Sequence, residues 1–175
     1  MNNYQLSFLT LSVKTVIVHS ITYSIMGIFA YNFLNYEQAF ASPEMKCWMR
    51  QTSESLVMAG PLFQPIRGIL FAIAFFPLRE ILFGKNNGWL IIWLILVVLG
   101  ILSTFGPAPG SVEGMIYTVL PISIYTYIEV IPQALLLSVI LYYWVKNPDK
   151  IWINWIMGIF FFLIMIFPIL GLLTL

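Results

Sequence analysis

Long apolar stretches alternate along this chain with short polar connections. A helix needs about 20 apolar residues to cross the hydrocarbon core of a bilayer. Five stretches approach or exceed that length, and they lie at about residues 11–34, 56–77, 88–105, 115–145 and 151–174. Because few charged residues interrupt them, the pattern predicts an all-α fold. We expect a single domain over residues 1–175, a polytopic integral membrane bundle of five transmembrane helices.

The connections predict an orientation for this bundle. One side, together with the start of the first helix, holds five basic residues: Lys14, Arg79, Lys85, Lys146 and Lys150. The other side holds two, Lys46 and Arg50. The positive-inside rule then places the N-terminus in the cytoplasm and the C-terminus outside. Under this orientation Trp89, Trp93, Trp144, Trp152 and Trp155 all fall near the cytoplasmic interface, as in an aromatic belt.

The amino-acid composition agrees with a membrane location and excludes several classes of function. Hydrophobic residues make up 61% of the chain and charged residues only 9%, against about 25% in soluble domains. The net charge of +1 gives no reason to expect nucleic acid as a partner. A single cysteine, Cys47, and a single histidine, His19, exclude an internal disulfide, a thiolate metal cluster and a multi-histidine zinc site. We therefore expect no metal and no cofactor.

The connection at about 35–55 mixes charged and apolar residues, which predicts a short helix lying on the outer surface of the membrane. The loop at 106–114 holds Pro107 and Pro109 among glycines, so it does not continue a helix.

Polar residues within three of the predicted helices recur at helical spacing. Residues three, four or seven positions apart share one face of a helix, and polar faces in lipid turn toward other helices. His19 and Tyr23 are four apart in the first helix, and Tyr125, Glu129 and Gln133 follow the same spacing in the fourth. Gln64 and Arg67 are three apart in the second. The spacing predicts one intramembrane polar cluster, composed of Arg67, Glu129, Gln64, Gln133, His19, Tyr125 and Tyr23.

The charged members of this cluster, Arg67 and Glu129, are expected at similar depths. Arg67 lies about 15 Å from the outer end of its predicted helix and Glu129 about 20 Å from the outer end of its own. We therefore expect a direct Arg67–Glu129 ion pair. Such a pair could serve only to select neighbouring helices. However, a central arginine costs about 2.5–3.5 kcal/mol on insertion scales, and cheaper polar residues would select neighbours equally well. A functional polar site is the favoured interpretation.

Three functions are compatible with these residues. The first is a protein of the cell (inner or plasma) membrane that binds or translocates a small polar or anionic solute, or protons. The second is a non-catalytic accessory or scaffolding subunit, which would meet a second copy or another membrane protein through the apolar fifth helix. The third, a membrane-embedded lipid-modifying enzyme, has the least support because no catalytic constellation is visible. The expected partners are the lipid bilayer, a small polar solute or proton, and a membrane protein.

Overall fold

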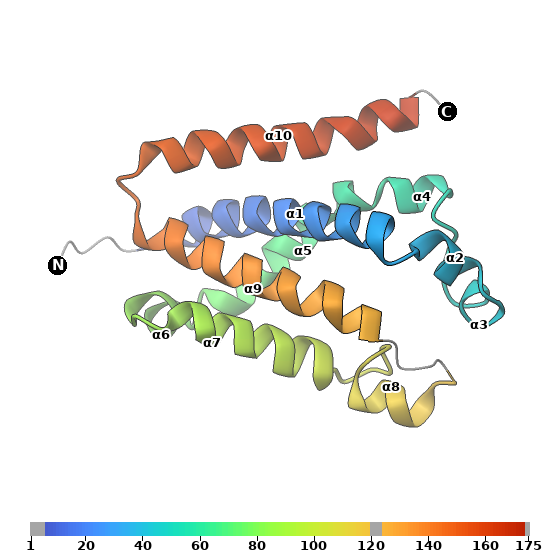
Figure 1. Ribbon diagram of the computed structural model, residues 1–175. Helices are drawn as coiled ribbons and strands as arrows, with labels where there is room; N and C mark the ends of the chain where they lie inside the picture. Colours follow the sequence, from blue (N-terminus) through green and yellow to red (C-terminus); the bar gives the residue numbers. More distant parts are fainter. Residues whose placement is uncertain (1–5, 120–123, 174–175) are drawn as a thin grey trace.

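The computed structural model describes residues 6–119 and 124–173, and within these ranges the chain forms helices and no strand. Five helical runs alternate in direction along one axis, so that the start of the first and the end of the last lie at opposite ends (Figure 1). The runs are α1 (Phe8–Phe33), α4 (Ser55–Met58) with α5 (Gly60–Phe75), α7 (Gly88–Leu94) with η1 (Ile95–Leu102), α9 (Ile124–Lys146), and α10 (Ile151–Leu173).

Shorter helices connect these runs at the two ends of the bundle. Figure 1 shows α2 (Tyr36–Ala41), α3 (Pro43–Lys46) and α8 (Val112–Tyr117) at one end, and α6 (Arg79–Gly84) at the other. The expected helix within 35–55 is therefore present, as two short helices. Each of α3 and α8 begins at a serine, Ser42 and Ser111, whose hydroxyl accepts a backbone hydrogen bond three residues on.

Within the described residues, three helices are long and apolar enough to cross a membrane, namely Phe8–Phe33, Tyr127–Lys146 and Ile151–Leu173. This supports the all-helical fold and is compatible with a membrane protein. The second and third predicted spans correspond to shorter apolar helices, Gly60–Phe75 and Gly88–Leu102. The 16 residues of α5 extend about 24 Å, less than the roughly 30 Å of hydrocarbon.

The single helix predicted over about 115–145 is wrong. α8 ends at Tyr117, and the next residue, Thr118, has an extended backbone with φ −115° and ψ 152°. α9 then begins at Ile124. Because a residue with an extended backbone cannot continue the hydrogen-bond pattern of a helix, α8 ends before α9 begins.

α1 is the central helix, and it packs against α5, α9 and α10. Two of its buried hydroxyls bond to carbonyls of the same helix, Thr15 to the Leu11 oxygen at 2.7 Å and Thr22 to the His19 oxygen at 3.2 Å. The buried hydroxyls of Ser12, Ser20 and Ser24 have no hydrogen-bond partner among the described residues. α5 approaches α1 closely at Gly68, where an added Cβ would lie 2.5 Å from the Cα of Val16. Glycine therefore allows the two backbones to meet, as small residues do between membrane helices.

A buried lysine joins three of the long helices at the end of the bundle that holds α6. Lys14 of α1 is 8% exposed, and its Nζ donates to the carbonyl of Trp144 in α9 at 2.9 Å. The Trp144 indole in turn donates to Oδ1 of Asn154 in α10 at 2.7 Å. Lys14 thus contributes its charge to the last turn of α9, where a cation is favourable.

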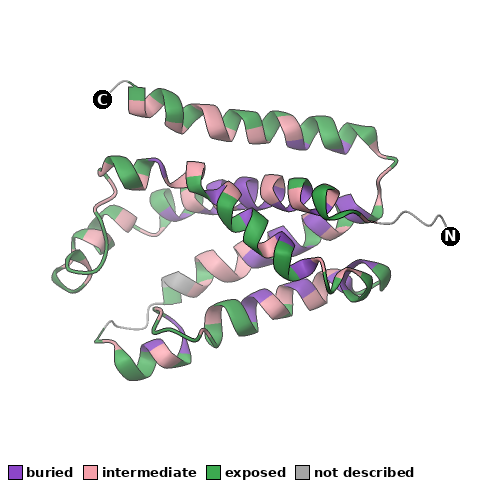
Figure 2. Ribbon diagram, turned by 180° about the vertical axis from the view of Figure 1, so that it is seen from behind, coloured by how far each residue is buried: buried purple, intermediate pink, exposed green. Residues whose placement is uncertain are grey.

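α10 lies at the edge of the bundle, and few of its described residues are buried. Ile153 and Met157 are its buried residues within the described range, and most of its other apolar side chains face outward. Figure 2 shows this contrast with α1, whose buried positions run along most of its length. An apolar helix with this exposure is suited to lipid or to a partner helix.

Candidate polar cavity between α1, α5, η1 and α9

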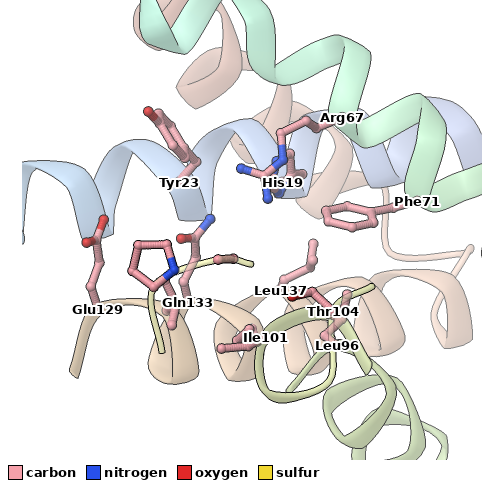
Figure 3. A pocket seen from close by; sticks show the side chains of 15 residues that line it. His19, Tyr23, Arg67, Phe71, Leu96, Ile101, Thr104, Glu129, Gln133 and Leu137 are labelled. Carbon is pink, nitrogen blue, oxygen red and sulfur yellow. The ribbon is translucent and has the colours of Figure 1, made fainter. Parts of the chain in front are cut away.

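A cavity of about 400 Å³ opens between α1, α5, η1 and α9, and its volume falls within the range of small-molecule sites. Five residues of the predicted cluster line it, namely His19, Tyr23, Arg67, Glu129 and Gln133. Figure 3 shows Arg67 reaching in from α5, while Glu129 and Gln133 extend from α9. His19 and Gln133, 114 positions apart in the sequence, thus border one space.

Gln64 does not line the cavity, but it holds His19 in place. The Gln64 Nε2 donates to the Gly60 carbonyl at 3.1 Å, which leaves Oε1 to face His19. Nε2 of His19 lies 3.1 Å from that oxygen and therefore carries the proton in this hydrogen bond. His19 is only 1% exposed, and its Nδ1 has no hydrogen-bond partner within the described residues. The side chain of the remaining predicted member, Tyr125, lies outside the described residues.

Arg67 lies along its own helix against an aromatic ring. Its Cζ is 5.8 Å from the ring centroid of Phe71, one turn further along α5. The Phe71 ring meets the His19 ring edge-on, with 4.9 Å between centroids. Cation–π and aromatic contacts of this kind hold the guanidinium at the border of the cavity without a carboxylate partner. Arg67 is nevertheless exposed in the isolated chain.

The predicted Arg67–Glu129 ion pair is not formed. Among the described side chains, the ion pair within 4.0 Å joins Arg50 to Glu54, at 2.9 Å in the connection before α4. Hydrogen bonding to Arg50 there lowers the pKa of the Glu54 carboxyl. Arg67 and Glu129 stay apart because α5 and α9 both pack mainly on α1 rather than on each other. The two charged side chains line the same cavity, but they do not contact each other.

The sequence did not indicate that the third helical run would form a wall of this cavity. Leu96, Gly100 and Ile101 of η1 line it. η1 is a π-helix of eight residues, and the Ser103 amide closes it on the Val98 carbonyl at 2.9 Å. Segments of π-helix are rare and recur at functional sites. Because the η1 sequence, ILVVLGIL, has no polar residue, the spacing of polar residues gives no sign that η1 lines a cavity. Gly100 is the one residue of η1 that differs from the large apolar residues around it.

A compact loop covers one end of the cavity. Ala108 and Pro109 of this loop line the space together with Thr104. The Tyr127 hydroxyl of α9 donates to the Gly110 carbonyl at 2.8 Å, and Gly110 has a φ of +82° that favours glycine. Oγ of the fully buried Ser111 donates to the Ala108 carbonyl at 2.8 Å and accepts from the Gly114 amide at 2.9 Å. The loop is therefore tied both to α9 and to the start of α8.

Comparison of the chain with protein-family models, with curated proteins and with solved structures finds no match. The fold and the site therefore indicate a general class of protein, but they do not identify a family. The chain is an all-helical bundle with long apolar helices, compatible with a membrane protein, and it has a cavity bordered by one cation, one carboxylate and apolar walls.

Proposed function

We propose that this protein is a multi-pass protein of the cell membrane whose cavity binds the anionic group of a small polar solute through Arg67. All five helical runs cross the bilayer in this proposal, with the N-terminus in the cytoplasm and the C-terminus outside. The alternating direction of the runs supports it, since each connection then returns to the side that the sequence assigns to it. Local thinning and tilt accommodate the shorter α5.

The single observation that carries the binding proposal is the position of Arg67. Its guanidinium borders a cavity in the middle of an apolar bundle and has no carboxylate within 4.0 Å among the described residues. In the proposed bilayer an arginine at this position would lack the counter-charge that offsets the cost of a charge in the membrane. An anionic ligand group would supply that charge, and the planar guanidinium suits a carboxylate or phosphate.

In this proposal a solute reaches the cavity from outside, past the loop that covers one end of it. Thr104, Ala108 and Pro109 border it at the end of the bundle that holds α2, α3 and α8. Under the proposed orientation that end faces the exterior. The same cavity would form the outward-facing half of a path for the solute or for protons, with Glu129 and His19 as the groups able to exchange a proton.

Binding of a singly charged anion tests this proposal directly. The full-length protein in neutral nanodiscs would be equilibrated with labelled hexanoate and, separately, with hexan-1-ol, which has the same chain without the charge. We expect hexanoate to bind more tightly, and Arg67→Gln to remove most of that advantage. Arg50→Gln, a matched change outside the cavity, should leave it unchanged. Equal binding of hexanoate to the wild type and to Arg67→Gln would contradict the proposal.

A second function, that of an accessory subunit, has one observation in its favour. α10 leaves nearly all of its apolar surface outside the bundle, including a shallow groove at Gly158 and Ile159. A partner helix, or a second copy, could pack there. Purification in mild detergent followed by native mass spectrometry tests it: a partner of fixed stoichiometry supports this function, and a monomer without a partner counts against it.

A further inference from the structure

Glu129 has no role in the binding of a simple anion, yet it borders the same cavity as Arg67. Its carboxylate makes no hydrogen bond and no ion pair with any side chain that the structure describes. It comes from α9, whereas Arg67 comes from α5, and α1 is the helix on which both pack. The cavity therefore presents an unpaired cation and an unpaired carboxylate at two separate places on its border.

Between and around these charges the cavity is bordered mainly by apolar side chains. Phe71, Leu96, Ile101 and Leu137 contribute apolar surface from α5, η1 and α9. Four neutral polar side chains complete the border, those of Gln133, His19, Tyr23 and Thr104. Gln133 lies one turn beyond Glu129 on α9, and His19 is almost fully buried with an Nδ1 that has no partner among the described residues. Such a border suits a ligand with an apolar body and polar ends.

From this arrangement we infer that the ligand is a zwitterion with an apolar body, bound with its anionic group at Arg67 and its cationic group at Glu129. This inference rests on the proposed function, and it adds the class of ligand. A purely anionic ligand would pair with Arg67 and leave the Glu129 carboxylate without a counter-charge. A zwitterion brings a counter-charge to each side chain, and complementary charge of this kind selects one ligand class against another.

Two sources could supply this chemistry. One is a free solute such as an amino acid, and the other is the headgroup of a zwitterionic phospholipid whose acyl chains leave through the open side of the cavity. Both would place an anion at Arg67 and an ammonium at Glu129, so the test must compare them.

The test uses the full-length protein in dodecylmaltoside micelles and a matched set of probes. Leucine and 6-aminohexanoate are isomers that carry both charges at different spacings, while hexanoate and hexan-1-amine each carry one charge. Dihexanoylphosphatidylethanolamine and dihexanoylphosphatidylglycerol are the corresponding lipid pair, the first with a zwitterionic and the second with an anionic headgroup. Affinities would be measured by equilibrium binding and competition.

We expect at least one zwitterion to bind about tenfold or more tightly than its singly charged counterparts. Glu129→Gln, which is nearly isosteric, should abolish that preference while leaving hexanoate binding in place. Glu113→Gln, a matched change outside the cavity border, should preserve the preference. A preference for the soluble zwitterions identifies a free solute as the source, and a preference for the ethanolamine lipid identifies a headgroup; either supports the inference.

The failure of this inference can be told apart from the failure of the proposed function. If hexanoate binds through Arg67 and no zwitterion binds more tightly, the zwitterion inference is wrong and anion binding stands. If no probe binds in an Arg67-dependent manner, both are wrong. The comparison of probes on the wild-type protein needs no variant, so it remains decisive even if Glu129→Gln does not fold.

Discussion

Nε2 of His19 donates a hydrogen bond to Oε1 of Gln64, at 3.1 Å between two buried side chains of α1 and α5. Gln64 is oriented by its own helix, since its Nε2 donates to the Gly60 carbonyl. The bond sets the direction of the imidazole at the border of the cavity. It also links the two helices that pack most extensively on each other.

Loss of this hydrogen bond should destabilise the protein, and substitutions of His19 and Gln64 should have effects on stability that are not additive. We expect Gln64→Leu to lower the free energy of unfolding by about 1–3 kcal/mol, because it leaves a buried donor on His19 without a partner. His19→Leu in the Gln64→Leu background should then cost less than it does alone. Reversible unfolding in mixed micelles measures the double-mutant cycle, and additive effects of the two substitutions would show that the residues do not interact.

The close approach of α5 to α1 at Gly68 gives a second prediction. An added Cβ would lie 2.5 Å from the Val16 backbone, so the helices must separate to admit it. Gly68→Ala should reduce the free energy of unfolding by about 1–3 kcal/mol, as over-packing does. Gly158→Ala is the matched control in α10, where a Cβ meets nothing within 4 Å, and the helix preference for alanine should stabilise it by up to about 1 kcal/mol. The same unfolding assay distinguishes them, and equal effects would contradict the packing described.

Lys14 should be important for stability rather than for the attraction of lipid headgroups. Lys14→Met removes the hydrogen bond to the Trp144 carbonyl, and we expect a loss of about 1.5–3 kcal/mol, as for a bond to a charged group. The exposed Lys85 offers a control, since Lys85→Met should change stability by less than about 0.5 kcal/mol. Similar stabilities for the two variants would place the Lys14 ammonium outside the bundle.

The loop over the cavity depends on Tyr127. Tyr127→Phe removes the hydrogen bond to the Gly110 carbonyl, so amide hydrogens between residues 104 and 114 should exchange faster while those in α1 keep their protection. Hydrogen exchange with mass spectrometry resolves this segment. Tyr117→Phe, at an exposed tyrosine of α8, should leave exchange unchanged; unchanged exchange in Tyr127→Phe as well would mean that the hydroxyl does not hold the loop.

Helical spacing predicted the polar positions well, because the face of a helix follows from its periodicity alone. His19 and Tyr23 border the cavity together with Arg67, Glu129 and Gln133. What spacing cannot give is the order of helices around the bundle. α1 takes the central place through small residues such as Ser20 and through Gly68 opposite Val16, and this keeps Arg67 from reaching Glu129.

Other features depend on backbone geometry that has weak sequence signals. The sequence of the π-helix η1 is that of an ordinary apolar helix, so its contribution to the cavity was not predicted. The burial of Lys14 depends on a carbonyl 130 residues away. The end of α8 at Tyr117 was not predicted, because apolar length favoured a helix over about 115–145.

The central claim is that Arg67 and Glu129 face a polar cavity inside the membrane that opens to the exterior. Its most direct test is thiol labelling of intact cells by a membrane-impermeant methanethiosulfonate, in a Cys47→Ser background. Gln133 borders the cavity, whereas Leu135 lies at nearly the same height on α9, does not border it and is 37% exposed. We expect Gln133→Cys to be labelled, and we expect Leu135→Cys, which faces lipid in this proposal, to remain unlabelled. Absence of labelling at Gln133→Cys, or equal labelling at both positions, would contradict it.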